Sequence, residues 1–67
     1  LSYITKEELR VLIAIEMGLK NHEFVPIVLI EKISHLKHSN VYKLLGPLLK
    51  NKLITHEIQK KRFHSYL

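Results

Sequence analysis

The spacing of apolar residues changes once along this chain, close to residue 54, and the change leaves few folds open. Up to Leu48 the apolar residues recur every three or four positions, which is the repeat of an α-helix with one buried face. From Ile54 onward apolar and polar residues alternate, which is typical of a β-strand. The sequence therefore predicts a mainly α fold in which helices come first and a β-hairpin comes last.

A first helix is predicted from about residue 6 to residue 17. Thr5 and Glu8 have the spacing of a capping box, in which each side chain bonds the backbone N–H of the other residue. Gly18 is expected to end this helix in the left-handed conformation. The predicted buried side carries four apolar residues at helical spacing: Leu9, Leu12, Ile13 and Met17.

A second helix is predicted from about Pro26 to Leu36. Proline suits the first turn of a helix, because the N–H that it lacks would have no partner there. An additional short strand can form just before it, at Phe24 and Val25. The apolar side of this helix is expected to carry Leu29, Ile30, Ile33 and Leu36.

A third helix is predicted from Ser39 to Lys50, after a tight turn at residues 37–38. Ser39 is a favourable N-cap residue. Pro47 follows Gly46 inside this helix and removes one backbone hydrogen bond, so we expect a kink there in preference to a break. The side that faces the core is expected to carry Val41, Leu44, Leu45 and Leu48.

Two strands close the predicted fold, at residues 54–58 and 63–67. They flank the polar segment 59–62, Gln-Lys-Lys-Arg, which would form the tip of the hairpin. Two helices joined by a short turn and followed by a hairpin form a winged helix-turn-helix. We therefore predict one domain over residues 1–67, with three helices, a two-stranded wing and a possible short third strand.

The composition narrows the functional classes. The chain has no aspartate or cysteine and only two glycines, so it lacks the aspartates and the glycine-rich loop of a kinase active site. Its five histidines have no cysteine or nearby carboxylate to complete a zinc site. We expect no catalytic residue, metal or cofactor in these residues. With no membrane-spanning run and no secretory signal in the sequence, an intracellular monomer is expected.

The positive charge lies in the second half of the chain. Residues 1–36 hold four lysines and arginines against five glutamates, whereas residues 37–67 hold seven against one. Such asymmetry indicates a basic surface for a polyanion. In a helix-turn-helix protein the third helix here would enter a groove, and the wing would contact the backbone. The predicted nucleic-acid contacts are Ser39, Asn40, Tyr42, Lys43, Lys50, Lys60, Lys61 and Arg62.

A run from Met17 to Glu23, Met-Gly-Leu-Lys-Asn-His-Glu, resembles the segment after the first helix in the second RIO subfamily of atypical Ser/Thr protein kinases. The similarity continues through Val25-Pro26, Leu36-Lys37-His38, Val41-Tyr42-Lys43-Leu44 and Lys52-Leu53-Ile54. The sequence differs from that subfamily at Ser39-Asn40, where a Gly-Gly pair is usual, and at Gly46-Pro47.

This resemblance implies the N-terminal winged helix of an ATP- and Mg-dependent kinase that acts in maturation of the small ribosomal subunit. The closing helix and the kinase domain of that subfamily are not among these residues. It also implies that the partner is rRNA or the pre-ribosomal small subunit, with contacts at residues 39–50 and 59–64. The implied location is mainly the cytoplasm, with possible nuclear passage. The helix order alone leaves two alternatives open, a DNA-binding transcriptional regulator and a protein-docking module, with the kinase domain in cis as one partner.

Overall fold

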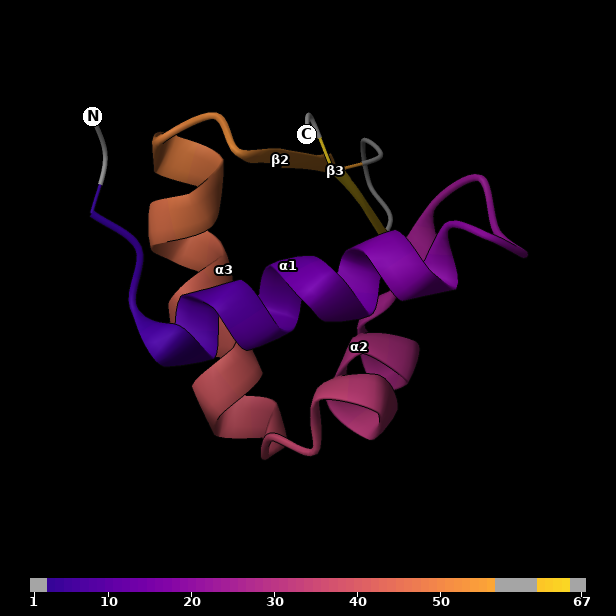
Figure 1. Ribbon diagram of the computed structural model, residues 1–67, viewed down its shortest axis with the longest axis horizontal. Coiled ribbons are helices and arrows are strands. Elements are labelled where there is room, and N and C mark those ends of the chain that lie inside the picture. Colours follow the sequence, from indigo (N-terminus) through magenta and orange to yellow (C-terminus); the bar gives the residue numbers. More distant parts are fainter. Residues whose placement is uncertain (1–2, 57–61, 66–67) are drawn as a thin grey trace.

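The computed structural model describes residues 3–56 and 62–65 of the chain. Three helices enclose one core, and a small sheet lies at one end of them (Figure 1). This is the predicted winged helix. The elements in chain order are α1 (Lys6–Gly18), β1 (Val25–Pro26), α2 (Ile27–Ser34), α3 (His38–Lys50), β2 (Ile54–His56) and β3 (Arg62–Ser65).

The sheet is antiparallel and has the strand order β1-β3-β2, so the last strand of the chain lies in the middle. Val25 pairs with Phe63 on one side of β3, and Ile54 pairs with Ser65 on the other. The short strand before α2 was predicted correctly, but it comprises Val25–Pro26 and not residues 24–25. Pro26 can lie in β1 because β1 is an edge strand, where a missing N–H breaks no ladder on its outer side.

The core is built from every element. Its buried apolar residues are Val11, Leu12, Ala14, Ile15, Val25, Ile27, Ile30, Val41, Leu45, Leu48, Ile54 and Phe63. The predicted buried side of α3 is confirmed, with Leu44 only partly buried. That of α1 is wrong apart from Leu12, since Leu9, Ile13 and Met17 are each about half exposed. Because α1 packs against α2, α3 and the sheet, it buries the side that contains Val11 and Ile15.

The two ends of α1 differ in how well they were predicted. The capping box is present: Thr5 N–H donates to Oε1 of Glu8 at 2.9 Å, and Glu8 N–H donates to Oγ1 of Thr5 at 3.1 Å. Gly18, however, is the last helical residue and has no positive φ. Glycine is needed there for a different reason, because a Cβ would lie 2.7 Å from Cγ1 of Val25.

The helix-turn-helix has a longer turn than predicted. α2 ends at Ser34, two residues early, because His35 adopts the left-handed conformation with φ 59°. α3 begins at His38 with Lys37 as its N-cap, so the prediction of Ser39 as the cap is wrong. Lys37 is extended, and its carbonyl accepts from the N–H of Val41 at 3.0 Å, so the helix starts two residues earlier than it would with Ser39 as its cap.

α3 continues through Pro47 as one helix, so the chain does not break there. After it, Lys52 is left-handed with φ 59°, and the N–H of Leu53 donates to the carbonyl of Leu48 at 3.0 Å. This bond pattern is a Schellman motif, which ends the helix and turns the chain into β2. Arg62 is the first residue of β3 and not part of the loop, a correction of its predicted place. The predicted strand ends at residues 57–58 and 66–67 and the tip at 59–61 lie outside the described residues.

Candidate nucleic-acid interface

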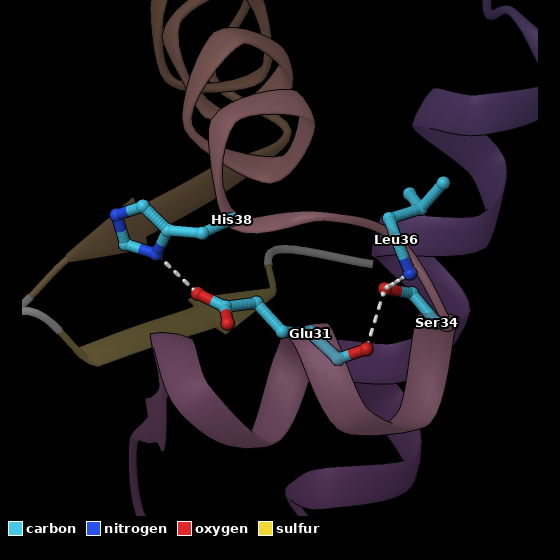
Figure 2. A network of polar contacts seen from close by, with 4 residues as sticks. All are labelled: Glu31, Ser34, Leu36 and His38. Atoms are coloured by element: carbon cyan, nitrogen blue, oxygen red, sulfur yellow. Dashed lines mark hydrogen bonds and ion pairs between the residues drawn. The ribbon is translucent and has the colours of Figure 1, made fainter.

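A polar network fixes the turn that sets the direction of α3 (Figure 2). Leu36 N–H donates to Oγ of Ser34 at 3.3 Å, and this hydroxyl donates to the carbonyl of Glu31 at 3.5 Å. The same carbonyl accepts from the N–H of His35 at 2.9 Å. The carboxylate of Glu31 also contacts Nδ1 of His38, the first residue of α3. The last turn of α2 and the first turn of α3 are therefore joined through both main-chain and side-chain contacts.

A side chain from α1 supports the same turn. The guanidinium of Arg10 donates to the carbonyl of Ser34 at the C-terminal end of α2. Carbonyls at that end of a helix lack partners within the helix, and a cation is favourable there. Through Arg10 the turn is tied to α1 as well as to α2 and α3, so the orientation of α3 is fixed relative to the whole core.

One side of α3 faces away from the core. Val41, Leu45 and Leu48 are buried on the opposite side. We call the outward side the exposed face of α3, and it consists of Ser39, Tyr42, Lys43, Gly46, Pro47 and Lys50. Asn40, also predicted as a contact, is only partly exposed at the edge of this face. The structure thus brings five of the predicted contact residues together on a single helix.

An aromatic pair lies at the first turn of α3. The rings of His38 and Tyr42 are 5.2 Å apart between centroids, with an interplanar angle of 65°. Tyr42 is 49% exposed. An exposed aromatic ring can stack on a nucleobase, and a phenol can bond phosphate. His38 was not among the predicted contacts, although its position four residues before Tyr42 places the two side chains on neighbouring parts of one helix.

The described part of the predicted wing contacts consists of Arg62 and His64, which lie in β3. Arg62 pairs with Pro26 across the sheet and is partly buried. His64 is also partly buried: its ring lies edge-on to Phe24 at 5.7 Å, and Nδ1 is 2.6 Å from the carbonyl of Ser65. Lys60 and Lys61 lie outside the described residues, so their role in binding stays a prediction.

The sequence along α3 and the segments that flank it is basic, although the carboxylate of Glu31 contacts His38 at the first turn. From Lys32 to His56 the chain carries five lysines and no acidic residue. Lys43 and Lys50 lie on the exposed face of α3 itself. Such a surface attracts the phosphates of a nucleic acid. Over residues 3–56 and 62–65 no three histidine, aspartate or glutamate side chains group to hold a metal ion, and no helix is long and apolar enough to cross a bilayer.

Comparison with known proteins shows the family of this chain. The family model described as "Rio2, N-terminal" matches residues 1–67. Serine/threonine-protein kinase rio2 of Dictyostelium discoideum is 46% identical over 57 residues, which are 85% of this chain and 11% of that protein. Serine/threonine-protein kinase RIO2 of Caenorhabditis elegans is 41% identical over 64 residues, 96% of this chain and 12% of that protein.

A third relative is serine/threonine-protein kinase rio2 of Schizosaccharomyces pombe, 40% identical over 52 residues, which are 78% of this chain and 15% of that protein. The chain thus spans between 11% and 15% of the length of these three kinases. The family match covers all 67 residues. The spacing of apolar residues predicts the winged-helix fold without reference to this match. The chain belongs to the Rio2 N-terminal domain family.

Proposed function

We propose that this chain is the nucleic-acid-binding module of a RIO-type Ser/Thr protein kinase that acts in maturation of the small ribosomal subunit. It binds rRNA of the pre-ribosomal particle, chiefly in the cytoplasm, and performs no catalysis of its own. The relatives carry the name of serine/threonine-protein kinases, and the chain matches only a small part of each. Kinase activity, ATP and Mg therefore belong to the remainder of the parent protein in this proposal.

The observation that carries the proposal is the exposed face of α3. Lys43 and Lys50 lie on it, and the sequence that contains it, from Lys32 to His56, has no acidic residue, while Glu31 contacts His38 at the first turn. A rigid helix that presents lysines away from the core can neutralise phosphates without rearrangement. Each neutralised phosphate releases condensed counterions, which favours binding at low salt. Ser39 and Tyr42 add hydroxyl groups that can bond phosphate or sugar.

The test compares two double variants of equal charge. Lys43→Gln with Lys50→Gln removes both lysines from the exposed face of α3, whereas Lys6→Gln with Lys20→Gln removes two exposed lysines of the α1 region. Fluorescence anisotropy would measure binding of the 67-residue chain to a small-subunit rRNA stem and to a duplex DNA between 50 and 200 mM salt. We expect the α3 variant to bind the rRNA more weakly and to lose roughly 1.4 to 1.8 from the slope of log affinity against log salt.

The α1 control should keep most of the affinity and of the salt slope. Equal losses in both double variants would refute α3 as the interface and would indicate only a general effect of net charge. Preference for the duplex DNA would instead support a DNA-binding regulator. Absence of binding to either probe would refute the proposed function.

A second candidate function, protein docking, is favoured by one observation on α1. Leu9, Ile13 and Met17 recur every four residues and are half exposed. Ile13 and Met17 also line an open groove of about 170 Å³ between α1 and α2, together with Ile33. The nearest partner is the remainder of the same polypeptide, such as its kinase domain. Binding to a protein partner that does not change with salt concentration, and that is lost in Ile13→Glu, would support this candidate.

A further inference from the structure

Gly46 lies where a side chain would have open space on the outside of the helix. It lies near the centre of α3, and its φ is not positive. A Cβ added there would meet nothing within 4 Å, whereas a Cβ on Gly18 would press into Val25. Glycine is less favourable than alanine in a helix. Glycine relieves the crowding that a Cβ would meet from the ring of the following Pro47, but no other contact that the structure describes requires a glycine at this point of the exposed face of α3.

Pro47 changes the hydrogen bonding beside Gly46. Proline has no N–H, so the helix supplies no donor four residues after the carbonyl of Lys43. Lys43, Gly46 and Pro47 are all exposed, which places this part of the helix on its solvent side. A bound molecule that carries an O–H can donate to that carbonyl. The step from Gly46 to Pro47 thus combines room for close approach with a carbonyl, that of Lys43, to which the residue four positions later cannot donate.

Groups that suit a ribonucleotide chain surround this step. Tyr42 lies one turn before Gly46, next to His38, and can stack on an unpaired base. Lys50 lies one turn after Gly46 and can neutralise a phosphate. The ribose 2′-hydroxyl is both a donor and an acceptor, and it is the group by which proteins distinguish RNA from DNA. DNA offers no equivalent donor at this point of its sugar.

We propose that the Gly46–Pro47 step is the contact point for the sugar–phosphate backbone of a single-stranded RNA. Gly46 lets the strand approach the helix closely, and the carbonyl of Lys43 accepts a hydrogen bond from a ribose 2′-hydroxyl. Tyr42 holds the adjoining base. This inference rests on the proposed nucleic-acid function and adds to it the RNA selectivity and the residues that provide it.

The test uses three fluorescein-labelled 12-nucleotide probes of one sequence: RNA, DNA and 2′-O-methyl RNA. Anisotropy titrations with the 67-residue chain should give RNA an affinity roughly three- to tenfold above the other two, the range of one net hydrogen bond. In Pro47→Ala the restored N–H occupies the carbonyl of Lys43. RNA affinity should then fall to that of DNA, while DNA affinity stays unchanged.

Gly46→Ala separates an effect on binding from an effect on stability. The melting temperature should stay within about 4 °C of the wild type, because the helix preference of alanine is opposed by the contact of its Cβ with the ring of Pro47. Affinity for RNA and DNA should fall together, by roughly tenfold or more, because the Cβ holds the strand away. Val28→Ala is the matched control: Val28 is 70% exposed on α2, and its replacement also favours the helix without changing charge.

The control should bind all three probes as the wild type does. Unchanged RNA binding in Gly46→Ala would overturn the close approach at this residue, and an unchanged ratio of RNA to DNA affinity in Pro47→Ala would overturn the carbonyl contact. In both cases the wild type still binds, so the proposed function survives. Failure of the wild type to bind any probe or the rRNA stem would overturn the proposed function and this inference together.

Discussion

Replacing Gly18 with alanine tests how closely α1 packs against β1. The new Cβ would lie 2.7 Å from Cγ1 and 2.9 Å from Cγ2 of Val25, where carbon atoms in contact normally lie about 3.5 to 4.0 Å apart. Val25 is fully buried and pairs with Phe63 in the sheet. Its branched side chain has little freedom at χ1, so it cannot swing aside.

The expected magnitude follows from two opposing effects. Alanine stabilises the helix by up to about 1 kcal/mol relative to glycine. Inserting a methyl group into a closely packed core destabilises by about 1 to 3 kcal/mol. Because Val25 cannot move without disturbing β1, we expect the packing effect to dominate. Gly18→Ala should therefore lower the free energy of unfolding by about 1 to 2 kcal/mol.

Urea unfolding followed by circular dichroism at 222 nm measures this change, and a double-mutant cycle assigns its cause. Val25→Ala removes both γ carbons and should destabilise by about 2 kcal/mol. In the double variant the clash is absent, so its loss should be smaller than the sum of the single losses by about 1 kcal/mol or more. Additive losses, or a Gly18→Ala protein as stable as the wild type, would refute the close packing.

Two further predictions concern helix ends, and urea unfolding measures both. Thr5→Ala should lower the free energy of unfolding by about 1 kcal/mol because it removes the capping box, whereas Ser39→Ala should leave it unchanged or slightly raised, since Ser39 caps nothing. An equal loss at both positions would contradict the observed start of α3. Lys52→Gly should raise the free energy of unfolding by about 0.5 to 1 kcal/mol by relieving the left-handed conformation. Lys43→Gly, inside α3, should lower it by about 1 kcal/mol, and the same sign at both lysines would contradict this reasoning.

Local signals in the sequence were sufficient for part of the fold. The capping box needs only two residues three apart, and it formed as predicted. The buried side of α3 was also predictable, because Val41, Leu45 and Leu48 are the only strongly apolar stripe consistent with its lysines facing outward. Once that side is known, the exposed face of α3 follows from the helical repeat. The exposed positions of Lys43 and Lys50 could therefore be predicted from the sequence.

Other features depend on contacts between distant residues. α1 carries two apolar stripes, one with Ile13 and one with Ile15, and only its packing against three neighbours decides which is buried. Serine is a favoured N-cap residue, so Ser39 was a reasonable choice from the sequence. In the structure, His38 contacts Glu31 in the turn between α2 and α3, and the N-cap is Lys37. No local pattern encodes either outcome. For the wing the prediction was partly wrong, because Arg62 joins the sheet.

The position of β3 has a consequence for how the domain forms during synthesis. β1 and β2 each pair with β3 and not with one another, and β3 is made last. While the ribosome still holds residues 62–65 in its exit tunnel, Val25 and Ile54 have no partner strand, and the core lacks Phe63. The three helices can form as they emerge, but the sheet closes only after translation has passed Ser65. The nascent chain therefore presents α3 before the wing beside it exists.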